Sequence, residues 1–572
     1  MKTIMSVTLA AVAALATLCG CSVAQKSGVD RVLLNAAVYT VDDEHSWAEA
    51  LAIDAGKIVY VGTNEGARKL IDAATQVDEL DNKMVMPGFH DSHAHVLAGG
   101  LSESSCNLND LRDRALIREA LIVCSKEPRF AENDWVVGAR WALAAFDNGQ
   151  PPIEWLDEIF AGKPAYFVDS FSHSAWVSSS ALAIAGIDAD TPNPDGGVIE
   201  RDPKTGKPTG TLRDTAMALV GKHTPPETDE SRRDGILAGQ RRAAAFGITA
   251  YTEPGLDEAQ ASAYQRADSA GELSARVLIS LSPASWHTAA FGSEIFDLLA
   301  KRNGFSGRYV SADSVKIYID GVIETRTSYM LQPYEGGEEN FPPFYNQKTL
   351  NELVQKIDAM GVQVHTHAIG DGAIRNALNA YEHARKVNGP SDNRHQITHL
   401  QLIDKADIPR FGDLNVAADF QSLWAYPDDY IDVAIPEVGE ERVSRFYPIA
   451  SVVKTGGTII GGSDWDVSSL NPLEAIEVAV TRQDPWSNKG PILTESERVE
   501  LATIIDAYTR NAAFVMRLDD VSGSLEVGKS ADLIVLDRNL FKIEPAEISE
   551  AKVLMTMVDG REVFSNDAPH PE

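Results

Sequence analysis

Eight short runs rich in apolar and β-branched residues recur along the chain, and they restrict its fold more than any other feature. They lie at about 85–95, 249–253, 277–281, 314–320, 362–367, 395–400, 416–421 and 458–464. Most are separated by helix-compatible stretches such as "KTLNELVQKIDAMG". Strands that alternate with helices indicate a parallel α/β sheet, and eight such units close a (β/α)8 TIM-like barrel. We therefore predict an α/β protein built on such a barrel, at about 87–515.

Two further units are predicted around the barrel. The interval from 96 to about 248 is too long for one connection, so we expect an inserted subdomain at about 100–245. Strand-like runs also occur at both ends of the chain, for example "ALAIDAGKIVYVG" and "GSLEVGKSADLIVLD". Neither terminal piece could bury its apolar face alone. We expect 29–86 and 516–566 to pack together as a small composite β-sandwich.

The first 21 residues have the pattern of an export signal. Lys2 precedes an apolar run from Ile4 to Leu18, which is short for a membrane span and ends in "LCGC". This ending resembles a bacterial lipoprotein signal, which implies cleavage before Cys21 and lipid attachment to its sulfur. An ordinary signal peptide cut near "SVAQ" is the alternative. Both predict an exported protein, and the first places it on the periplasmic side of a bacterial membrane, held only by its lipid.

Composition limits the partners and the cysteine chemistry. The chain has 51 Lys and Arg against 83 Asp and Glu, a net charge of −32, which opposes binding to nucleic acid. After cleavage before Cys21 and lipid attachment to its sulfur, only Cys106 and Cys124 remain unmodified. They are compatible with either one disulfide or two buried thiols.

The motif "MPGFHDSHAH" (86–95) indicates a metal site. In a strand, Asp91, His93 and His95 would share one face and present a pair of nitrogen ligands. Other predicted strands end in polar groups: Lys316 with Tyr318 and Asp320, His365 and His367 followed by Asp371, His395 with His399, and Asp464. The carboxyl ends of barrel strands carry the active site, so four imidazoles and a carboxylate predict a Zn²⁺ site. His90, His365 and His395 could instead be hydrogen-bonded core residues.

The segment "HQITH" (395–399) allows a second interpretation, the helical zinc-protease motif with a Glu between two His. Gln396 occupies the Glu position and cannot take a proton from water. Ile397 and Thr398 favour a strand. We therefore do not expect a protease.

Taken in order, the motifs resemble the metal-dependent amidohydrolase superfamily, in its amidohydrolase 3 or YtcJ-like branch. The matching segments include "MPGFHDSHAH", "VKIYIDGVIETRTSYM", "VHTHAIGDGAI", "RHQITHLQLI" and "GGSDWDVSSLNPLEAIEVAVTR". The resemblance implies hydrolysis of an amide or related C–N bond other than a peptide bond. It also implies metal ligation by His93, His95, His367 and His399, and a general acid/base role for Asp464. Lys316 matches a lysine that, when carboxylated, bridges two ions, so one or two ions, most simply Zn²⁺, are expected.

Further roles follow if the attacking group is a water molecule activated by the metal. Asp464 would move the proton from water to the leaving nitrogen, and His173 or His365 would support the oxyanion. Asp91, Asp320 and Asp371 are available to orient the imidazoles. Arg326 would meet an anionic substrate group or form an exposed ion pair, and Trp465 would line the pocket or the core.

Alternatives to amide hydrolysis stay open. The same scaffold and ligands could support a deaminase, a lactonase or an isomerase. The protein could also be a non-catalytic, lipid-anchored binding protein. The substrate is expected to be a small-molecule amide of unknown identity, and a homodimer is compatible with the sequence.

Overall fold

The structure is a computed structural model. It describes residues 28–566 apart from 45, 104, 110, 129, 131–132, 171, 284–290, 339 and 488. The predicted signal segment with Cys21 lies outside the described residues.

The eight predicted runs form one sheet of parallel strands in the order β21-β20-β19-β18-β17-β16-β15-β8. Backbone N–H groups of Ser92 and Asp464 donate to Gly461 O (3.0 Å) and His93 O (2.7 Å) and join the two outer strands at their carboxyl ends. The result is a nearly closed barrel, which confirms the predicted fold class. The strands are β8 (Phe89–Asp91), β15 (Ile248–Leu256), β16 (Arg276–Leu281), β17 (Val310–Tyr318), β18 (Gln363–Ala368), β19 (Gln396–His399), β20 (Ala417–Phe420) and β21 (Ile459–Gly461).

Amphipathic helices cover the barrel. In α11 the Asn346 side chain caps the first turn, and Leu350, Leu353, Val354 and Ile357 bury one face at helical spacing. The barrel helices are α2 (Val96–Ser102), α8 (Asp229–Ala245), α9 (Glu258–Ser269), α10 (Glu294–Lys301), α11 (Gln347–Ala359), α12 (Asp371–Asn388), α13 (Ile408–Leu414), α14 (Asp429–Val438), α15 (Glu440–Val443), α16 (Ile449–Lys454), α17 (Pro472–Thr481), α18 (Leu501–Ala507) and α19 (Arg510–Val515). In the part of the chain that the structure describes, no helix is both long and apolar enough to cross a bilayer.

The insertion between α2 and α8 forms a subdomain with its own sheet, in the order β13-β14-β12-β11-β10-β9. Buried Trp141 and Trp176 lie in its separate apolar core. Cys106 and Cys124 are joined by a disulfide, which decides between the two alternatives for these residues. Its elements are β9 (Cys106–Asn107), α3 (Arg114–Cys124), β10 (Val136–Trp141), α5 (Ile153–Ile159), β11 (Ala165–Asp169), β12 (Ser174–Val177), α6 (Ser179–Ala185), β13 (Gly197–Arg201), β14 (Pro208–Asp214) and α7 (Met217–Gly221).

The ends of the chain form two further sheets. The sheet β5-β4-β1-β6 comes from the N-terminal part alone, and the sheet β24-β23-β22-β7-β2-β3 contains strands from both ends. In the second sheet β7 pairs with β22, so that Val85 lies opposite Val535 and the two termini share one sheet. The elements are β1 (Arg31–Leu34), β2 (Ala37–Tyr39), β3 (Trp47–Ala48), β4 (Ala50–Asp54), β5 (Lys57–Gly62), α1 (Asn64–Arg68), β6 (Gln76–Glu79), β7 (Met84–Pro87), β22 (Leu533–Leu536), β23 (Val553–Val558) and β24 (Arg561–Ser565).

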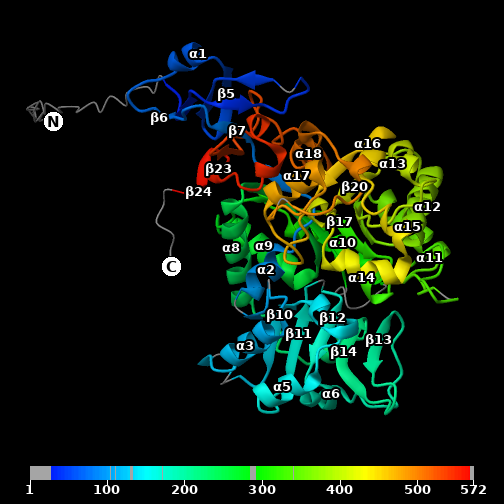
Figure 1. Cartoon of the computed structure of the whole chain (residues 1–572). Coiled ribbons are helices and arrows are strands. Elements are labelled where there is room, and N and C mark those ends of the chain that lie inside the picture. The colour runs from blue at the N-terminus through cyan, green and yellow to red at the C-terminus, as the bar shows by residue number, and fades with distance from the viewer. Residues whose placement is uncertain are drawn as a thin grey trace, which may run out of the picture.

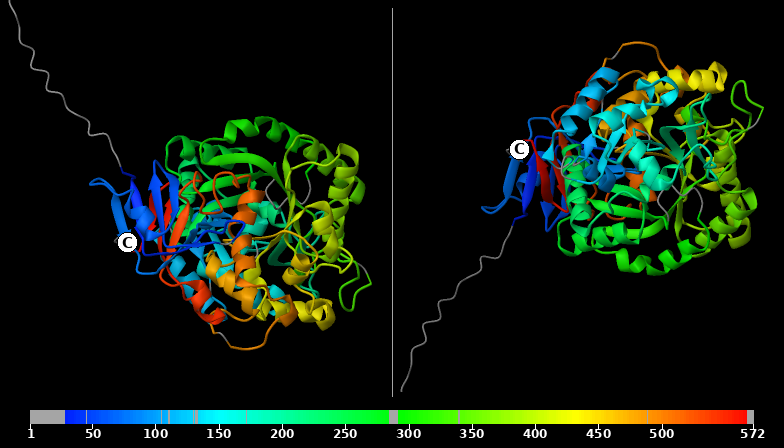
Figure 2. Two further views of the ribbon diagram at one scale, coloured as in Figure 1. Left: turned by 90° about the horizontal axis from the view of Figure 1, so that it is seen from above. Right: turned by 90° about the horizontal axis from the view of Figure 1, so that it is seen from below.

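The terminal sheets and the insertion lie on opposite sides of the barrel (Figure 1). The terminal sheets contact the amino ends of the strands, since Arg276, the first residue of β16, pairs with Asp532 at 2.7 Å. The insertion contacts the other end, where the His173 ring lies 5.3 Å from that of His367. Figure 2 shows the ring of helices around the barrel strands from both ends. The insertion therefore covers the barrel end at which active sites form.

Candidate metal centre

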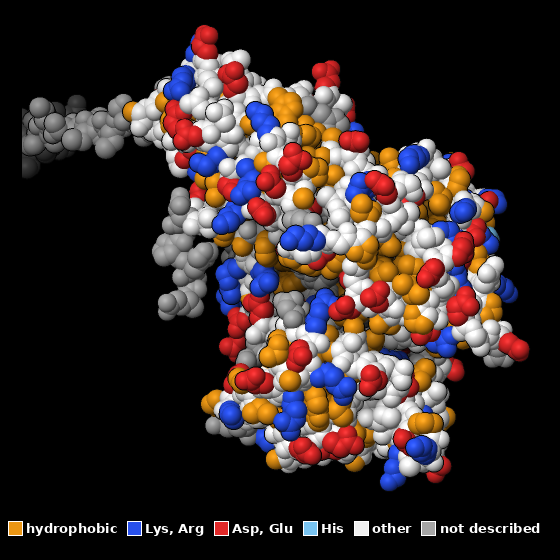
Figure 3. All heavy atoms as spheres, in the orientation of Figure 1, with side chains coloured by type: hydrophobic (Ala, Val, Ile, Leu, Met, Phe, Trp, Pro, Cys, Tyr) orange, Lys and Arg blue, Asp and Glu red, His pale blue; other side chains and the backbone are white. Residues whose placement is uncertain are grey.

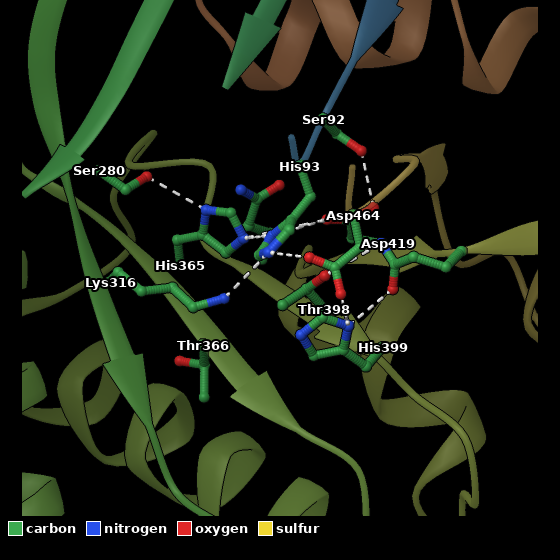
Figure 4. Close-up of polar contacts among 12 residues, drawn as sticks. Ser92, His93, Ser280, Lys316, His365, Thr366, Thr398, His399, Asp419 and Asp464 are labelled. Carbon is green, nitrogen blue, oxygen red and sulfur yellow. Dashed lines mark hydrogen bonds and ion pairs between the residues drawn. The ribbon is translucent and has the colours of Figure 1, made fainter. Parts of the chain in front are cut away.

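Three side chains meet where the first and last barrel strands end. Oδ1 of Asp464 lies 3.3 Å from Nε2 of His93 (Figure 4) and 3.3 Å from Nε2 of His95. Two ligand atoms about 2.0–2.1 Å from a tetrahedral Zn²⁺ lie about 3.3 Å from each other. This spacing and the donor types fit a divalent metal.

The two histidines do not lie on the strand that was expected to present them. β8 ends at Asp91, and both imidazoles come from the turn between this strand and α2. The turn is held by Asp91, whose Oδ1 accepts the backbone N–H groups of His93 (3.1 Å) and Ser463 (3.0 Å). The rings converge because this carboxylate ties the first and last strand ends together.

A second group of possible ligands shares His93 and adds His365 and Asp419. The ring nitrogens His93 Nδ1 and His365 Nε2 lie 2.7 Å apart, which is a hydrogen-bond distance and shorter than the spacing of two ligands on one metal. Of the two groups, the one with His95 and Asp464 therefore has the spacing that fits a metal ion.

Lys316, His367 and His399 complete the centre. Nζ of Lys316 lies 3.4 Å from His93 Nε2, and the rings of His367 and His399 have centroids 4.5 Å apart. Nδ1 of His399 is 3.8 Å from Oδ2 of Asp464. All six residues expected as ligands or acid/base thus come together from five strand ends.

Burial determines the charge of these groups. It holds the pKa of His93, His367 and His399 well below the usual value, so their rings stay neutral and able to coordinate a metal. Burial also lowers the pKa of Lys316 to about 7, although Asp464 and Asp419 act in the opposite direction. A fraction of Lys316 is therefore an unprotonated amine at neutral pH.

A cavity of about 360 Å³ opens onto this centre, lined by His367, His399 and Asp464 together with residues of the insertion and the loops. Aromatic rings form much of its wall: Trp424, Tyr426, Tyr430, Tyr447, Trp465 and Trp486. The Trp424 ring stacks on His399 with centroids 5.6 Å apart. The arrangement suits a small molecule with an apolar group placed over a metal centre.

Comparison with known proteins identifies the family. The model of the family described as "Amidohydrolase family" matches residues 76–564. The chain belongs to the amidohydrolase family. It is 28% identical to YtcJ of Bacillus subtilis (strain 168), covering 92% of this chain and 98% of that one. It is also 28% identical to N-substituted formamide deformylase of Arthrobacter pascens, covering 93% and 97%. An uncharacterized metal-dependent hydrolase from Pyrococcus horikoshii OT3 shares the fold, with a TM-score of 0.71, 23% identity and coverage of 90% and 99%.

The residues expected on the substrate side of this amidohydrolase divide into two groups. His173 and Trp465 line the cavity. Arg326 is half exposed and pairs with Glu437 at 2.7 Å, which is the ion-pair alternative, and it is not among the residues that line the cavity. His365 lies beneath the centre, fully buried against His93, because its strand position precedes His367 by two residues.

The three carboxylates expected to orient imidazoles also differ in position. Asp91 accepts hydrogen bonds from backbone N–H groups, as described above. Asp320 lies 3.7 Å from Nε2 of His367 and also accepts the backbone N–H groups of Ile369 and Gly370. Asp371 begins α12 and accepts the N–H of Leu331. The contacts of Asp371 stabilise the start of this helix rather than orient an imidazole of the metal centre.

Two side chains that the sequence analysis did not single out lie beside the ligands. Gln421 Oε1 is 2.9 Å from His399 Nδ1, and Asp419 accepts a 2.7 Å hydrogen bond from Ser92. They stand two positions apart at the end of the seventh run, "VAADFQ". The period-two spacing applied to the other strands would have found them.

The two other histidines considered in the sequence analysis, His90 and His395, have structural roles. His395 pairs with Asp358 at 3.1 Å and stacks on Tyr381, and His90 is buried with Nδ1 3.0 Å from Gly88 O. The segment "HQITH" lies largely in strand β19, which agrees with the strand interpretation and excludes the helical zinc-protease motif.

Proposed function

We propose that this amidohydrolase is exported and hydrolyses the C–N bond of a small-molecule amide, with Asp464 as general acid/base. The observation that carries the proposal is the position of Asp464. One of its oxygens lies 3.3 Å from two imidazole nitrogens, and the residue also lines the cavity. A carboxylate at this place can exchange protons with a substrate in the cavity.

The residues that would hold the metal are His93, His95 and Asp464. When bound, a divalent metal would supply a water that is deprotonated near neutral pH and would polarise the scissile carbonyl. A second ion would be held by His367, His399 and a carboxylated Lys316. The unprotonated fraction of Lys316 supports this modification, because a neutral amine attacks CO₂ to form a carbamate and releases one proton.

Proton transfer would follow from the positions of this chain's own groups. Asp464 accepts the proton of the attacking water and then donates it to the departing nitrogen. His173 is placed to stabilise the oxyanion. Burial disfavours charge on its ring, but the hydrogen bond to Asp214 (2.6 Å) outweighs this and raises the pKa of His173. Nδ1 of His173 is held by Asp214, and the residue lines the cavity on the side of the insertion.

The compartment and the bond type each have separate support. A disulfide persists in oxidising compartments, so the Cys106–Cys124 bond supports export of a protein whose first residues resemble a lipoprotein signal with lipid on Cys21. The name of the Arthrobacter pascens relative supports an amide substrate.

Activity screening tests the proposal. Zinc-loaded protein is assayed against N-substituted formamides, N-acyl amino acids, dipeptides and aryl amides. We expect hydrolysis of at least one amide class, loss of activity with a chelator and recovery on adding Zn²⁺. A zinc-loaded protein that hydrolyses none of these amides, or activity that survives complete metal removal, would contradict it.

A further inference from the structure

A chain of buried polar side chains crosses the barrel interior from Gln363 to the metal centre. The contacts run from Gln363 Oε1 to Ser314 Oγ (3.0 Å), Ser280 Oγ (2.9 Å), His365 Nδ1 (3.1 Å) and, across that ring, from Nε2 to His93 Nδ1 (2.7 Å). Ser280, Ser314 and Gln363 are direct cross-strand neighbours on β16, β17 and β18. Figure 4 shows the upper part of this chain, from Ser280 through His365 to His93.

The orientation of the Gln363 amide is determined by the backbone. Its Nε2 donates to Arg394 O at 2.8 Å and to Val515 O at 2.9 Å. A carbonyl oxygen only accepts, so the reversed amide would place oxygen against two oxygens. Oε1 of Gln363 therefore faces Ser314 as an acceptor.

This orientation sets the direction of the next hydrogen bonds, because a hydroxyl has a single hydrogen. Ser314 gives its hydrogen to Gln363, so its oxygen must accept from Ser280. Ser280 has then used its own hydrogen, and its oxygen must accept from Nδ1–H of His365.

The direction continues through the two rings. A neutral imidazole carries one N–H, so His365 with its hydrogen on Nδ1 presents a lone pair at Nε2. The 2.7 Å contact needs one donor, which must be Nδ1–H of His93. Asp419 Oδ2, at 4.0 Å from the same nitrogen, is beyond hydrogen-bond range. The lone pair of His93 is left on Nε2, the atom that faces Asp464 and His95.

We propose that Gln363, acting through Ser314, Ser280 and His365, fixes the tautomer of His93 so that Nε2 is ready to coordinate the metal. These four are positioning residues, and their role rests on the proposed metal-dependent function. Reversal of the chain would put hydrogen on Nε2 of His93, which must then be removed before coordination.

The wild-type apo-protein provides the first test. In protein labelled with nitrogen-15 histidine and stripped of metal, ring signals of His93 are assigned by their loss in His93→Gln. We expect the hydrogen on Nδ1 of His93 and of His365. A hydrogen on Nε2 of His93 would overturn the proposal, and this result needs no catalytic assay.

Zinc affinity provides the second test, measured by competition with a chromophoric chelator. Ser314→Ala frees Ser280 to donate to His365 and reverses the chain, so we expect about a tenfold weaker affinity. Ser314→Thr keeps a hydroxyl and should restore the wild-type value. Thr366→Val is the matched control: it removes a buried hydroxyl on β18 that contacts Tyr381 (2.6 Å) outside the chain.

The outcomes are distinct. Equal zinc affinities for wild type and Ser314→Ala, or equal losses in Ser314→Ala and Thr366→Val, would contradict the proposal. If Ser314→Ala fails to fold, Ser280→Ala tests the neighbouring link, and the same tenfold loss is expected. If wild-type protein binds no zinc at all, the proposed function fails, while the tautomer measured in the apo-protein still decides the role of Gln363.

Discussion

Asp464 is the residue on which the chemistry of this amidohydrolase depends. Its backbone N–H donates to His93 O at 2.7 Å, and its carboxylate faces three imidazoles. The position and orientation of Asp464 are thus fixed by residues that follow the first barrel strand as well as by the last strand, which Asp464 itself follows. Proton transfer by such a positioned group typically contributes about 10²–10⁴-fold to the rate.

Asp464→Asn should therefore lower kcat by about 10²–10⁴-fold, because an amide cannot accept the proton. Zinc should still bind, since the imidazoles remain and Asn keeps one oxygen. Steady-state kinetics and metal analysis of the same sample check both points. Asp371→Asn, a carboxylate outside the centre, is the control and should keep near wild-type kcat. Full activity in Asp464→Asn would show that another group carries the proton.

Glu253 shows how burial of a single acid affects stability. Its carboxylate is buried against helices α9 and α2, where it accepts hydrogen bonds from Tyr264 (2.5 Å) and Leu97 N–H (3.2 Å), yet burial raises its pKa to about 7. The folded-state pKa is above the unfolded value of about 4.3, so the folded state binds the proton more tightly. The stabilising contribution is complete below the unfolded pKa and is lost as the pH rises through about 7.

Glu253→Gln should remove this pH dependence. Between pH 5 and pH 8 the wild-type free energy of unfolding should fall by up to about 3 kcal/mol more than that of the variant. Urea titrations of the apo-protein at both pH values measure the difference. The same pH dependence in both proteins would mean that Glu253 does not hold its proton in the folded state.

At the scale of elements, the terminal sheets are attached to the barrel by a buried ion-pair network. Arg276 at the start of β16 pairs with Asp532 (2.7 Å) and Asp559 (2.6 Å), and its side chain is 8% exposed. Arg308 also pairs with Asp559 (2.8 Å), but its side chain is 72% exposed. The two arginines therefore meet the same carboxylate in different dielectric surroundings.

Arg276→Met should destabilise the protein by about 3–5 kcal/mol, since it takes away the cation that pairs with the buried carboxylate of Asp532. Arg308→Met should change stability by less than about 1 kcal/mol, because water screens the exposed pair. Thermal or urea unfolding of both variants gives the comparison. Equal losses of stability in the two variants would indicate that solvent exposure does not determine how much these ion pairs stabilise the protein.

At the scale of the whole molecule, the insertion contributes to a site that the barrel alone does not complete. His173 comes from the loop before β12 and lines the cavity, and the subdomain that carries it contains the Cys106–Cys124 disulfide. Because the insertion supplies His173, its local order should control activity without unfolding of the barrel.

The face of the molecule shown in Figure 3 mixes both signs of charge. Acidic and basic side chains are interspersed on this face despite the net charge of −32.

Replacing both Cys106 and Cys124 by Ser should destabilise the insertion by about 3 kcal/mol, from the entropy of a loop with a sequence separation of 18. We expect earlier proteolysis within 106–214 and a lower temperature of half-inactivation, with little change in the barrel's own unfolding. A reducing agent should reproduce the effect in wild type and leave the double variant unchanged. An unaltered proteolysis pattern would mean that the disulfide does not support this subdomain.

Much of the architecture could be predicted from the sequence because strand periodicity and turn chemistry are local. The eight apolar runs identified the barrel strands, and the position of polar residues at their ends brought His93, His95 and Asp464 into one prediction. The long interval after α2 likewise predicted the insertion. Each of these features depends on residues close together in the chain.

Only the tertiary structure decided which partner each imidazole meets. Orientation was expected from Asp91, Asp320 and Asp371, whereas His365 contacts His93 and Gln421 contacts His399. These pairs join strands far apart in sequence, and their distances depend on barrel register and closure. A hydrogen bond is lost over a change of about 1 Å, which is finer than any strand prediction. The sequence by itself therefore determined which groups reach this end of the barrel, and the closed barrel decided how they are paired.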